Sequence, residues 1–186
     1  MTGDADADRL LNTDPLALLI AMLLDQQIPI EWAFIGPFRL VVRLDAPLDA
    51  HTIAALDPDA FAELVRTKPA LHRYPASMAQ RIQALCQHVA DVYEGDAAAI
   101  WRRVRSADTL RDRLLAVPGY GPEKAQIFIA ILAKRFDRRP EGWETAAGPF
   151  ADDKPRSVAD IDGTEALARV REWRKEKKSR GKTKAD

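Results

Sequence analysis

The segment that most constrains the fold is residues 107–136, where two helix-forming stretches are joined by a short turn rich in glycine and proline. The stretches ADTLRDRLLAV and EKAQIFIAILAKRF flank the turn PGYGP. Pro118 and Pro122 stiffen this turn, and Pro122 suits the first position of a helix, where its missing N–H is no loss. Gly119 and Gly121 let the chain turn sharply and let a ligand approach the backbone. The pattern therefore predicts a helix, a tight hairpin and a second helix.

The start of the second helix should present backbone N–H groups that have no partner within the helix. In the field of the helix dipole such groups attract anions, and a nucleic-acid phosphate is the commonest large one. We therefore expect amides around Gly119, Gly121 and Glu123 to bind one or two phosphates, and Lys124 to add a charge contact. These contacts carry no sequence information, and binding should weaken steeply with salt. The alternative is a plain turn between two helices.

The sequence LLAVPGYGPEKA resembles the hairpin of the helix-hairpin-helix DNA glycosylases, the HhH-GPD superfamily that includes endonuclease III. Residues 117–125 fit the family pattern L-P-G-[VI]-G-x-x-[TS]-A at the proline, both glycines and the alanine. A second segment, LLIAMLLDQQIPIEWAF at residues 18–34, resembles the family's helix that ends in L-L-S-x-Q. The resemblance covers residues 14–136 and fades beyond them.

This resemblance implies an all-α, bilobal DNA glycosylase-like fold with the bound DNA in the cleft between the lobes. It implies a base excision repair protein that binds double-stranded DNA, damaged or abasic, and acts as a monofunctional DNA glycosylase on the N-glycosidic bond of a damaged or mismatched base. One alternative is a non-catalytic DNA-binding or damage-recognition protein that retains the glycosylase fold. Another is a helical interaction protein whose hairpin binds no DNA. We expect a monomer in each case.

Bifunctional members of the family use a Lys inside the hairpin motif as a Schiff-base nucleophile, which requires a partly neutral amine. The matching position here is Glu123. Lys124 follows one residue later, which on a helix means a rotation of about 100°. AP-lyase activity is therefore not expected. A monofunctional enzyme still needs a carboxylate near the sugar, to stabilise the oxocarbenium-like charge or to activate water.

In the resembled family, that carboxylate is an Asp that follows the Lys position after a Gly/Pro-rich stretch. The spacing points to Glu141, with Glu144 next, whereas the Gly/Pro-rich context GPFADD points to Asp152 and Asp153. Asp160, in SVAD, is a third option. Asp152, Asp153 and Glu141 are thus catalytic candidates as alternatives to one another, and a further alternative is that all of them are solvated loop residues.

A glycosylase must also take its target base out of the stack, and something must fill the gap in the duplex. In the resembled family a residue of the L-L-S-x-Q segment does so, and Gln27 is the matching position. The alternative for Gln27 is a polar residue at a helix end. Trp32, Trp143, Tyr74 and the hairpin's Tyr120 are candidates for stacking on a flipped base, and burial in the core is the alternative for each.

Composition limits cofactors and partners further. Cys86 is the only cysteine, which excludes an intrachain disulfide and the four-cysteine iron–sulfur cluster that many endonuclease III relatives hold. No metal site made of side chains is expected, and the only ion that the resemblance implies is K⁺ or Na⁺ at carbonyls of the hairpin. Lys and Arg total 28, as do Asp and Glu, so the whole chain gives no basic signal. Residues 169–184, however, hold nine Lys or Arg against two Glu.

The chain reads as one helical domain over residues 1–175, followed by a basic disordered tail over 176–186. Its start has no signal-peptide pattern, and LALLIAMLL is too short to span a bilayer, so we expect a cytoplasmic protein with no membrane partner.

Asp14 and Pro15 should open a first helix, and a second should cover 30–35 before Gly36–Pro37. Residues 38–44 read as helix or extended connector, and short helices should follow near 49–56 and 58–67. Ser77 should cap a long helix, because Ser77 and Gln80 form a capping-box pattern. Residues 137–163 should form a long ordered loop with one turn of helix, and 164–175 a last helix.

Overall fold

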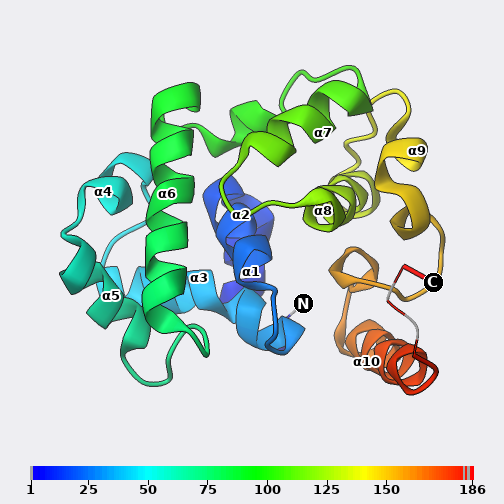
Figure 1. The fold of residues 1–186 in the computed structure, drawn as a ribbon, viewed down its shortest axis with the longest axis horizontal. Coiled ribbons are helices and arrows are strands. Elements are labelled where there is room, and N and C mark those ends of the chain that lie inside the picture. Colours follow the sequence, from blue (N-terminus) through cyan, green and yellow to red (C-terminus); the bar gives the residue numbers. More distant parts are fainter. Residues whose placement is uncertain (1, 182, 184) are drawn as a thin grey trace. The chain divides into compact units, whose positions relative to one another are not determined.

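The computed structural model describes residues 2–181, 183, 185 and 186. The regular elements of this part of the chain are ten α-helices and three 3₁₀ turns, with no strand among them, so the expected all-α fold is confirmed (Figure 1). The chain divides into two compact units. The N-terminal unit holds Thr2–Arg102 with Val117–Gly119, and the C-terminal unit holds Arg103–Ala116 with Tyr120–Asp186.

Helix α2 (Pro15–Leu24) forms the centre of the N-terminal unit, since every residue from Leu16 to Leu24 is buried. The uniformly apolar sequence of α2 indicates this central position, because a helix that is apolar on all sides must be surrounded by other elements. Its neighbours are α1 (Ala5–Thr13), α3 (Ile30–Leu44), α6 (Pro75–Tyr93) and the 3₁₀ turn η1 (Ala97–Ile100).

Aspartates begin four helices of this unit. Asp14 caps α2 as predicted, because its carboxylate accepts the N–H groups of Leu16 and Ala17 at 2.8 and 3.2 Å. Asp4 caps α1 in the same way. The sequence patterns did not predict this helix. Asp49 and Asp57 cap the two short predicted helices, α4 (Ala50–Ala55) and α5 (Pro58–Arg66).

The prediction that a helix ends before Gly36–Pro37 is wrong. Helix α3 runs from Ile30 to Leu44 with Pro37 inside it, so residues 38–44 are helical rather than an extended connector. Proline lacks an N–H and normally interrupts a helix, but burial of this segment compensates for the missing bond. Gly36 packs directly on α2, because a Cβ at this position would lie 2.5 Å from Cδ1 of Leu24. Tertiary packing therefore overrides the local break signal.

The predicted cap at Ser77 is also wrong. Helix α6 begins at Pro75, and Ser77 lies in its first turn. Proline is well suited to the first helical position, and here it extends the helix upstream of the capping-box pattern. The inward side of α6 is apolar, since Met78, Ile82 and Val89 are buried.

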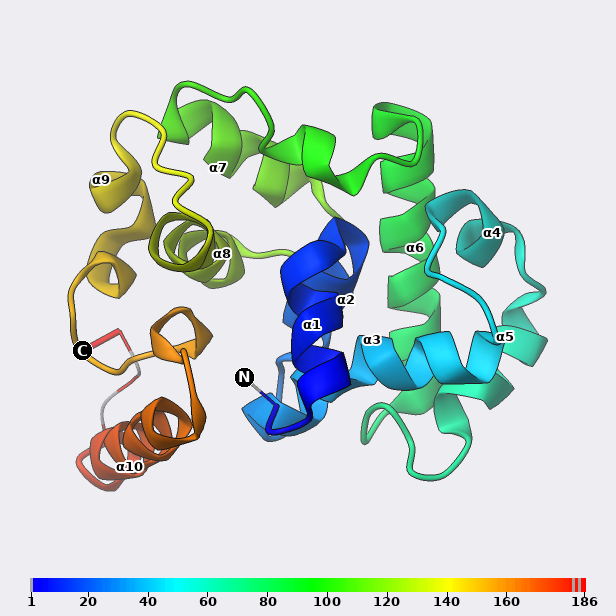
Figure 2. The same ribbon diagram turned by 180° about the vertical axis from the view of Figure 1, so that it is seen from behind.

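The C-terminal unit is built around α8 (Pro122–Arg135), in which every residue from Ile127 to Ala133 is buried. Around it pack α7 (Ala107–Ala116), α9 (Trp143–Ala147), η2 (Gly148–Ala151) and η3 (Val158–Asp160), as Figure 2 shows from behind. The hairpin helices thus form as predicted, although Leu115 is 40% exposed and does not belong to the apolar side of α7.

The last helix, α10 (Thr164–Ser179), packs on η3 and continues four residues past its predicted end. The tail predicted for residues 176–186 therefore begins as helix, and positions 182 and 184 lie outside the described residues.

The single thiol is sealed inside the N-terminal unit. Cys86 lies on α6 and is fully buried, and this burial, with a smaller effect of Asp49, raises the pKa of the thiol to about 12. Among the residues that the structure describes, no helix is long and apolar enough to cross a membrane.

Candidate functional site

The turn between α7 and α8 presents two unpaired backbone donors. Gly119 has φ +85°, a left-handed conformation that favours glycine, and Gly121 is extended with φ −102° and ψ 178°. Within the described part of the chain, the N–H groups of Gly119 and Gly121 donate no hydrogen bond. Both residues are exposed, so the two donors remain available to a ligand.

The two glycines have different surroundings. A Cβ at Gly119 would lie 2.4 Å from Cδ1 of Leu23, so this glycine is pressed against α2. A Cβ at Gly121 would meet nothing within 4 Å. Gly119 therefore fixes the turn on α2, whereas Gly121 faces open space at the start of α8.

The side chain of Tyr120 points into the core between these glycines. The whole residue is only 6% exposed, and its ring packs edge-to-face on Phe128, with 5.9 Å between the centroids. Burial raises the pKa of its hydroxyl well above the ordinary value of 10. Of the two options for Tyr120, the structure has the buried ring.

The first turn of α8 carries Glu123 and Lys124. Glu123 is exposed and occupies the position at which the resembled lyases have Lys, while Lys124 is half-buried. Both residues therefore lie on the helix that the sequence predicts for them.

Gln27 lies in the loop between α2 and α3 with a strained backbone. Its φ of +56° is in the left-handed region, which costs a non-glycine residue about 1–3 kcal/mol. Its side chain is exposed and forms no hydrogen bond within the described residues. Strain of this kind persists only where the surroundings hold the backbone, and it concentrates at functional sites.

The neighbouring residue, Gln26, is the point at which the loop is held. Its side-chain amide donates to the Leu23 carbonyl at 2.9 Å and its Oε1 accepts from Arg81 at 3.0 Å. His72, only 2% exposed, binds the Gln26 carbonyl through Nε2 at 2.8 Å. Because Nδ1 of His72 accepts the Tyr74 N–H at 3.1 Å, the proton must be on Nε2, which donates.

Leu23 joins the two segments that the sequence singles out. Its side chain supports Gly119 of the hairpin, and its carbonyl holds Gln26, next to Gln27. Hence Gly119 of the hairpin turn and the Gln27 loop are both held at the C-terminal end of α2, where Leu23 lies. No spacing rule in the sequence identifies Leu23, because it is one of nine consecutive buried residues.

A pocket that the sequence patterns did not predict lies beside the Gln27 loop. It encloses about 290 Å³ and is lined mainly by apolar atoms of six residues, Ile28, Pro29, Trp32, Ala70, His72 and Arg73. Two stacked pairs border it: Arg39 lies 4.2 Å from the Trp32 ring centroid, and Arg73 lies 4.8 Å from that of Tyr74. Trp32 and Tyr74 are 36% and 48% exposed, so the structure leaves both rings accessible, unlike that of Tyr120.

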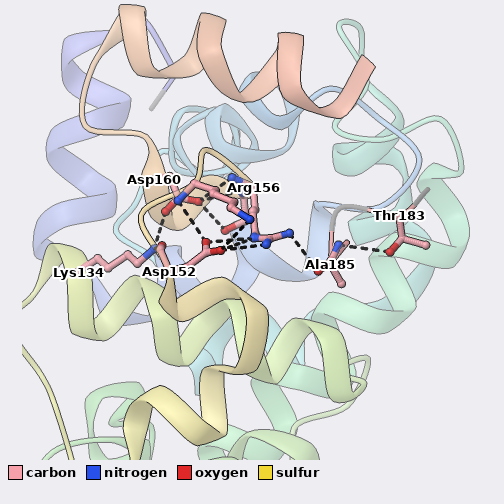
Figure 3. Close-up of polar contacts among 8 residues, drawn as sticks. Lys134, Asp152, Arg156, Asp160, Thr183 and Ala185 are labelled. Carbon is pink, nitrogen blue, oxygen red and sulfur yellow. Dashed lines mark hydrogen bonds and ion pairs between the residues drawn. The ribbon is translucent and has the colours of Figure 1, made fainter. Parts of the chain in front are cut away.

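Asp152, the first candidate carboxylate, is paired with a buried arginine. Its two carboxylate oxygens accept hydrogen bonds from Nε and Nη2 of Arg156 at 2.9–3.1 Å (Figure 3). Burial opposes ionisation, but the hydrogen bonds from Arg156 and from the Lys154 N–H outweigh it, so the pKa of Asp152 is lowered. This carboxylate is therefore ionised at neutral pH and largely neutralised by its partner.

Asp160 has a structural role in the same region. Its Oδ1 accepts a hydrogen bond from Nζ of Lys134 at 2.6 Å (Figure 3). Its Oδ2 accepts hydrogen bonds from the backbone N–H groups of Arg156 and Ser157 at 3.0 and 2.9 Å. With a side chain only 9% exposed, it anchors η3 to α8.

The remaining candidates, Asp153 and Glu141, are exposed, and their carboxylates form no hydrogen bond or ion pair within the described residues. The backbone of Glu141 pairs with residues at the start of α7: its N–H donates to the Arg105 carbonyl at 2.7 Å, and its carbonyl accepts the Ala107 N–H at 2.8 Å. Asp153 is held through its neighbour Asp152, whose backbone carbonyl accepts a hydrogen bond from Nζ of Lys134 near the end of α8. At about 1.5 Å per residue, both anchor points lie roughly 15–20 Å along the helices from the hairpin turn.

No group of three or more His, Cys, Asp and Glu side chains that could hold a metal gathers among the residues placed by the structure. The sequence matches a family described as "HhH-GPD superfamily base excision DNA repair protein" over residues 20–186, which includes both the Gln27 loop and the hairpin. Neither a curated protein nor a solved structure shows a significant similarity to the chain.

Proposed function

The chain belongs to the HhH-GPD superfamily of base excision DNA repair proteins, and from this premise we propose that it is a monofunctional DNA glycosylase. The observation that carries the proposal is the meeting of the hairpin and the Gln27 loop on Leu23. A phosphate-binding turn and an exposed side chain that can enter the duplex are the two parts that base extrusion requires.

The hairpin would hold the phosphate backbone of one strand. The N–H groups of Gly119 and Gly121 are available donors, and the dipole of α8 adds to the attraction for an anion. Since no Cβ stands in front of Gly121, a phosphate oxygen can approach the backbone closely there. Tyr120, Glu123 and Lys124 would take part through their backbone and, for Lys124, through its charge.

Gln27 would fill the space that the extruded base leaves. The hydrogen bonds to Gln26 hold the loop on one side, so Gln27 can project from it without giving up a contact of its own. The accessible rings of Trp32 and Tyr74 beside it could stack on an unpaired base, because an aromatic side chain gives about 1–3 kcal/mol per stacked base.

For the hydrolysis itself we propose Asp153, with Glu141 as the alternative that the same assay tests. Both carboxylates are exposed, which a group that meets the sugar requires. Asp152 would instead act through Arg156 as part of the frame that supports the loop, since its charge is already paired. Glu123 at the Schiff-base position argues against AP-lyase chemistry.

A K⁺ or Na⁺ ion at the hairpin belongs to the same proposal. The carbonyl oxygen of Gly119 accepts no hydrogen bond within the described residues, and neutral carbonyls of the hairpin are suitable ligands for such an ion. They would hold it close to the phosphate, where its charge strengthens the contact.

DNA binding by the hairpin can be tested with two matched glycine variants. Gly121 and Gly163 are both extended N-cap residues of a helix, and a Cβ added to either would meet nothing within 4 Å. Asp is a favourable N-cap residue, so both Gly121→Asp and Gly163→Asp should fold. Gly121→Asp should bind an abasic-site duplex more weakly and lower the slope of log K against log salt by about 0.9 for each phosphate that it no longer binds. Gly163→Asp should bind like wild type, and equal affinities of the two variants would refute the hairpin contact.

Activity requires a separate assay. Base release from a panel of damaged and mismatched duplexes should be measured for wild type, Asp153→Asn, Glu141→Gln and Asp152→Asn. Loss of release in Asp153→Asn, with normal duplex affinity, supports the assignment, and the same loss in Glu141→Gln alone transfers it to that residue. Absence of release by wild type on every lesion would remove the glycosylase proposal.

One observation favours a second function, damage recognition without catalysis. The candidate carboxylates are attached at the ends of α7 and α8 that lie about 15–20 Å from the turn, and successive nucleotides of one strand are about 3.4 Å apart along the duplex axis. A carboxylate so far along the helices would not face the sugar next to the bound phosphate. Tight binding of a lesion duplex without base release is the result that this second function predicts.

A further inference from the structure

One side of helix α10 carries basic charges only. Arg171, Lys175 and Lys178 are exposed and follow one another at i, i+4 and i+7, which places them along one side of the helix; we call them the basic stripe. Its three glutamates lie on another side, together with the two remaining exposed arginines: Glu165, Glu172, Glu176, Arg169 and Arg180. The inward side is apolar and packs on η3.

Helix stability does not explain the basic stripe. Like charges three or four residues apart destabilise a helix, and the stripe contains two such neighbouring pairs. Basic residues in the last turn favour the helix dipole, which accounts for Lys178. Arg171 and Lys175 lie before that turn, so the dipole gives them no comparable benefit.

Within its described residues, the protein does not pair the two lysines of the stripe with acidic side chains as it does Arg180 on the opposite side. Arg180 pairs with Glu176 at 2.7 Å, whereas neither Lys175 nor Lys178 forms an ion pair within the part of the chain that the structure describes. The two lysines therefore keep their charge for a partner outside the chain.

The stripe is displayed on a helix that is fixed to its unit. Two cations lie over the ring of Trp173, Arg156 at 5.5 Å and Lys177 at 4.4 Å from its centroid. Arg174 donates to the Arg156 carbonyl at 3.4 Å, which ties α10 to the loop before η3. The same C-terminal unit contains α8, whose N-cap residue is Gly121 (Figure 2).

We infer that the basic stripe is a second contact for the phosphates of duplex DNA, separate from the hairpin. Its seven-residue span measures about 10 Å at roughly 1.5 Å per residue, and duplex DNA carries one charge per about 1.7 Å of its axis. A row of cations meets such a linear polyanion in many registers, so it needs no shaped pocket. The inference rests on DNA binding by the chain and is independent of glycosylase chemistry.

The test compares two pairs of substitutions that remove the same charge from the same helix. Lys175→Gln with Lys178→Gln changes the stripe, and Arg169→Gln with Arg180→Gln changes the opposite side. Affinity of each full-length variant for an undamaged duplex is measured across salt concentrations, after circular dichroism confirms equal helix content. The stripe pair should weaken binding and lower the slope of log K against log salt by about 2, whereas the control pair should change it by less than about half as much.

Equal effects of the two pairs, or no effect of either, would overturn the inference, and so would absence of duplex binding by wild type. Base release distinguishes this from the proposed function. A chain that depends on the stripe for binding but releases no base supports the stripe and removes the glycosylase.

Discussion

Replacement of Gly119 by alanine should destabilise the protein, whereas the same change at Gly121 should not. At Gly119 two effects oppose the new methyl group, the backbone conformation and a steric conflict. The φ of +85° is a left-handed conformation, which disfavours an L-residue by about 1–2 kcal/mol. The Cβ would also lie 2.4 Å from Cδ1 of Leu23, a side chain with 0% exposure, so this side chain would have to shift within the core.

Overpacking of this kind adds about 1–3 kcal/mol, so the total loss should be about 2–4 kcal/mol. For a chain of this length that corresponds to a decrease in Tm of roughly 5–15 °C. At Gly121 the backbone is extended and the Cβ space is open. There, alanine should be close to neutral, because the restriction of the unfolded chain is offset by the weaker N-cap preference of alanine.

Urea denaturation of both variants measures the difference, and a double-mutant cycle separates its causes. In a Leu23→Ala background the steric conflict is removed, so Gly119→Ala should lose only the conformational part, about 1–2 kcal/mol. The coupling between positions 23 and 119 should therefore be about 1–3 kcal/mol. Zero coupling would mean that the hairpin does not rest on α2, and the reasoning about the joint site would fail with it.

Three further substitutions test other contacts. Asp14→Ala should lose about 1 kcal/mol through the missing cap, while Asp14→Asn should be near neutral, because burial raises the pKa of Asp14 and an uncharged cap avoids that desolvation. Since this folded pKa is raised, wild type should lose stability relative to Asp14→Asn as pH rises through it, which denaturation between pH 3 and pH 6 measures. Asp152→Asn should lose about 1–2 kcal/mol at pH 7, a value reduced because Asp152 is 37% exposed. As the pKa of Asp152 is lowered, that loss should disappear below its ordinary value of 3.8, and a constant loss down to pH 2 would contradict the ion pair. His72→Ala should lose about 1–3 kcal/mol and weaken DNA binding, because the Gln26 carbonyl and the Tyr74 N–H lose their partner; unchanged denaturation midpoints would exclude a structural role for the ring.

The sequence was sufficient for the parts of the fold that follow local rules. The hairpin helices and the buried α2 have strong periodic or uniform apolar patterns, and the Asp14 cap has its ordinary chemistry. Errors arose where packing overrides a local signal. Pro37 continues inside α3 because Gly36 is fixed against Leu24, and Pro75 starts α6 before Ser77 can cap it.

The candidate site divides in the same way. The glycines and Gln27 could be named from motifs, because turn chemistry and family resemblance act over a few residues. The role of Leu23, the clamp of His72 on Gln26 and the pairing of Asp152 with Arg156 depend on the folded positions of the side chains. A single sequence carries no information about such pairs.

The position of Cys86 has a practical consequence. A thiol that is fully buried and almost never ionised reacts poorly with maleimides, so the folded protein offers no background to them. A cysteine introduced by Gly121→Cys would stand in open space as the one reactive group, and a fluorophore attached there would report the arrival of a ligand at the hairpin.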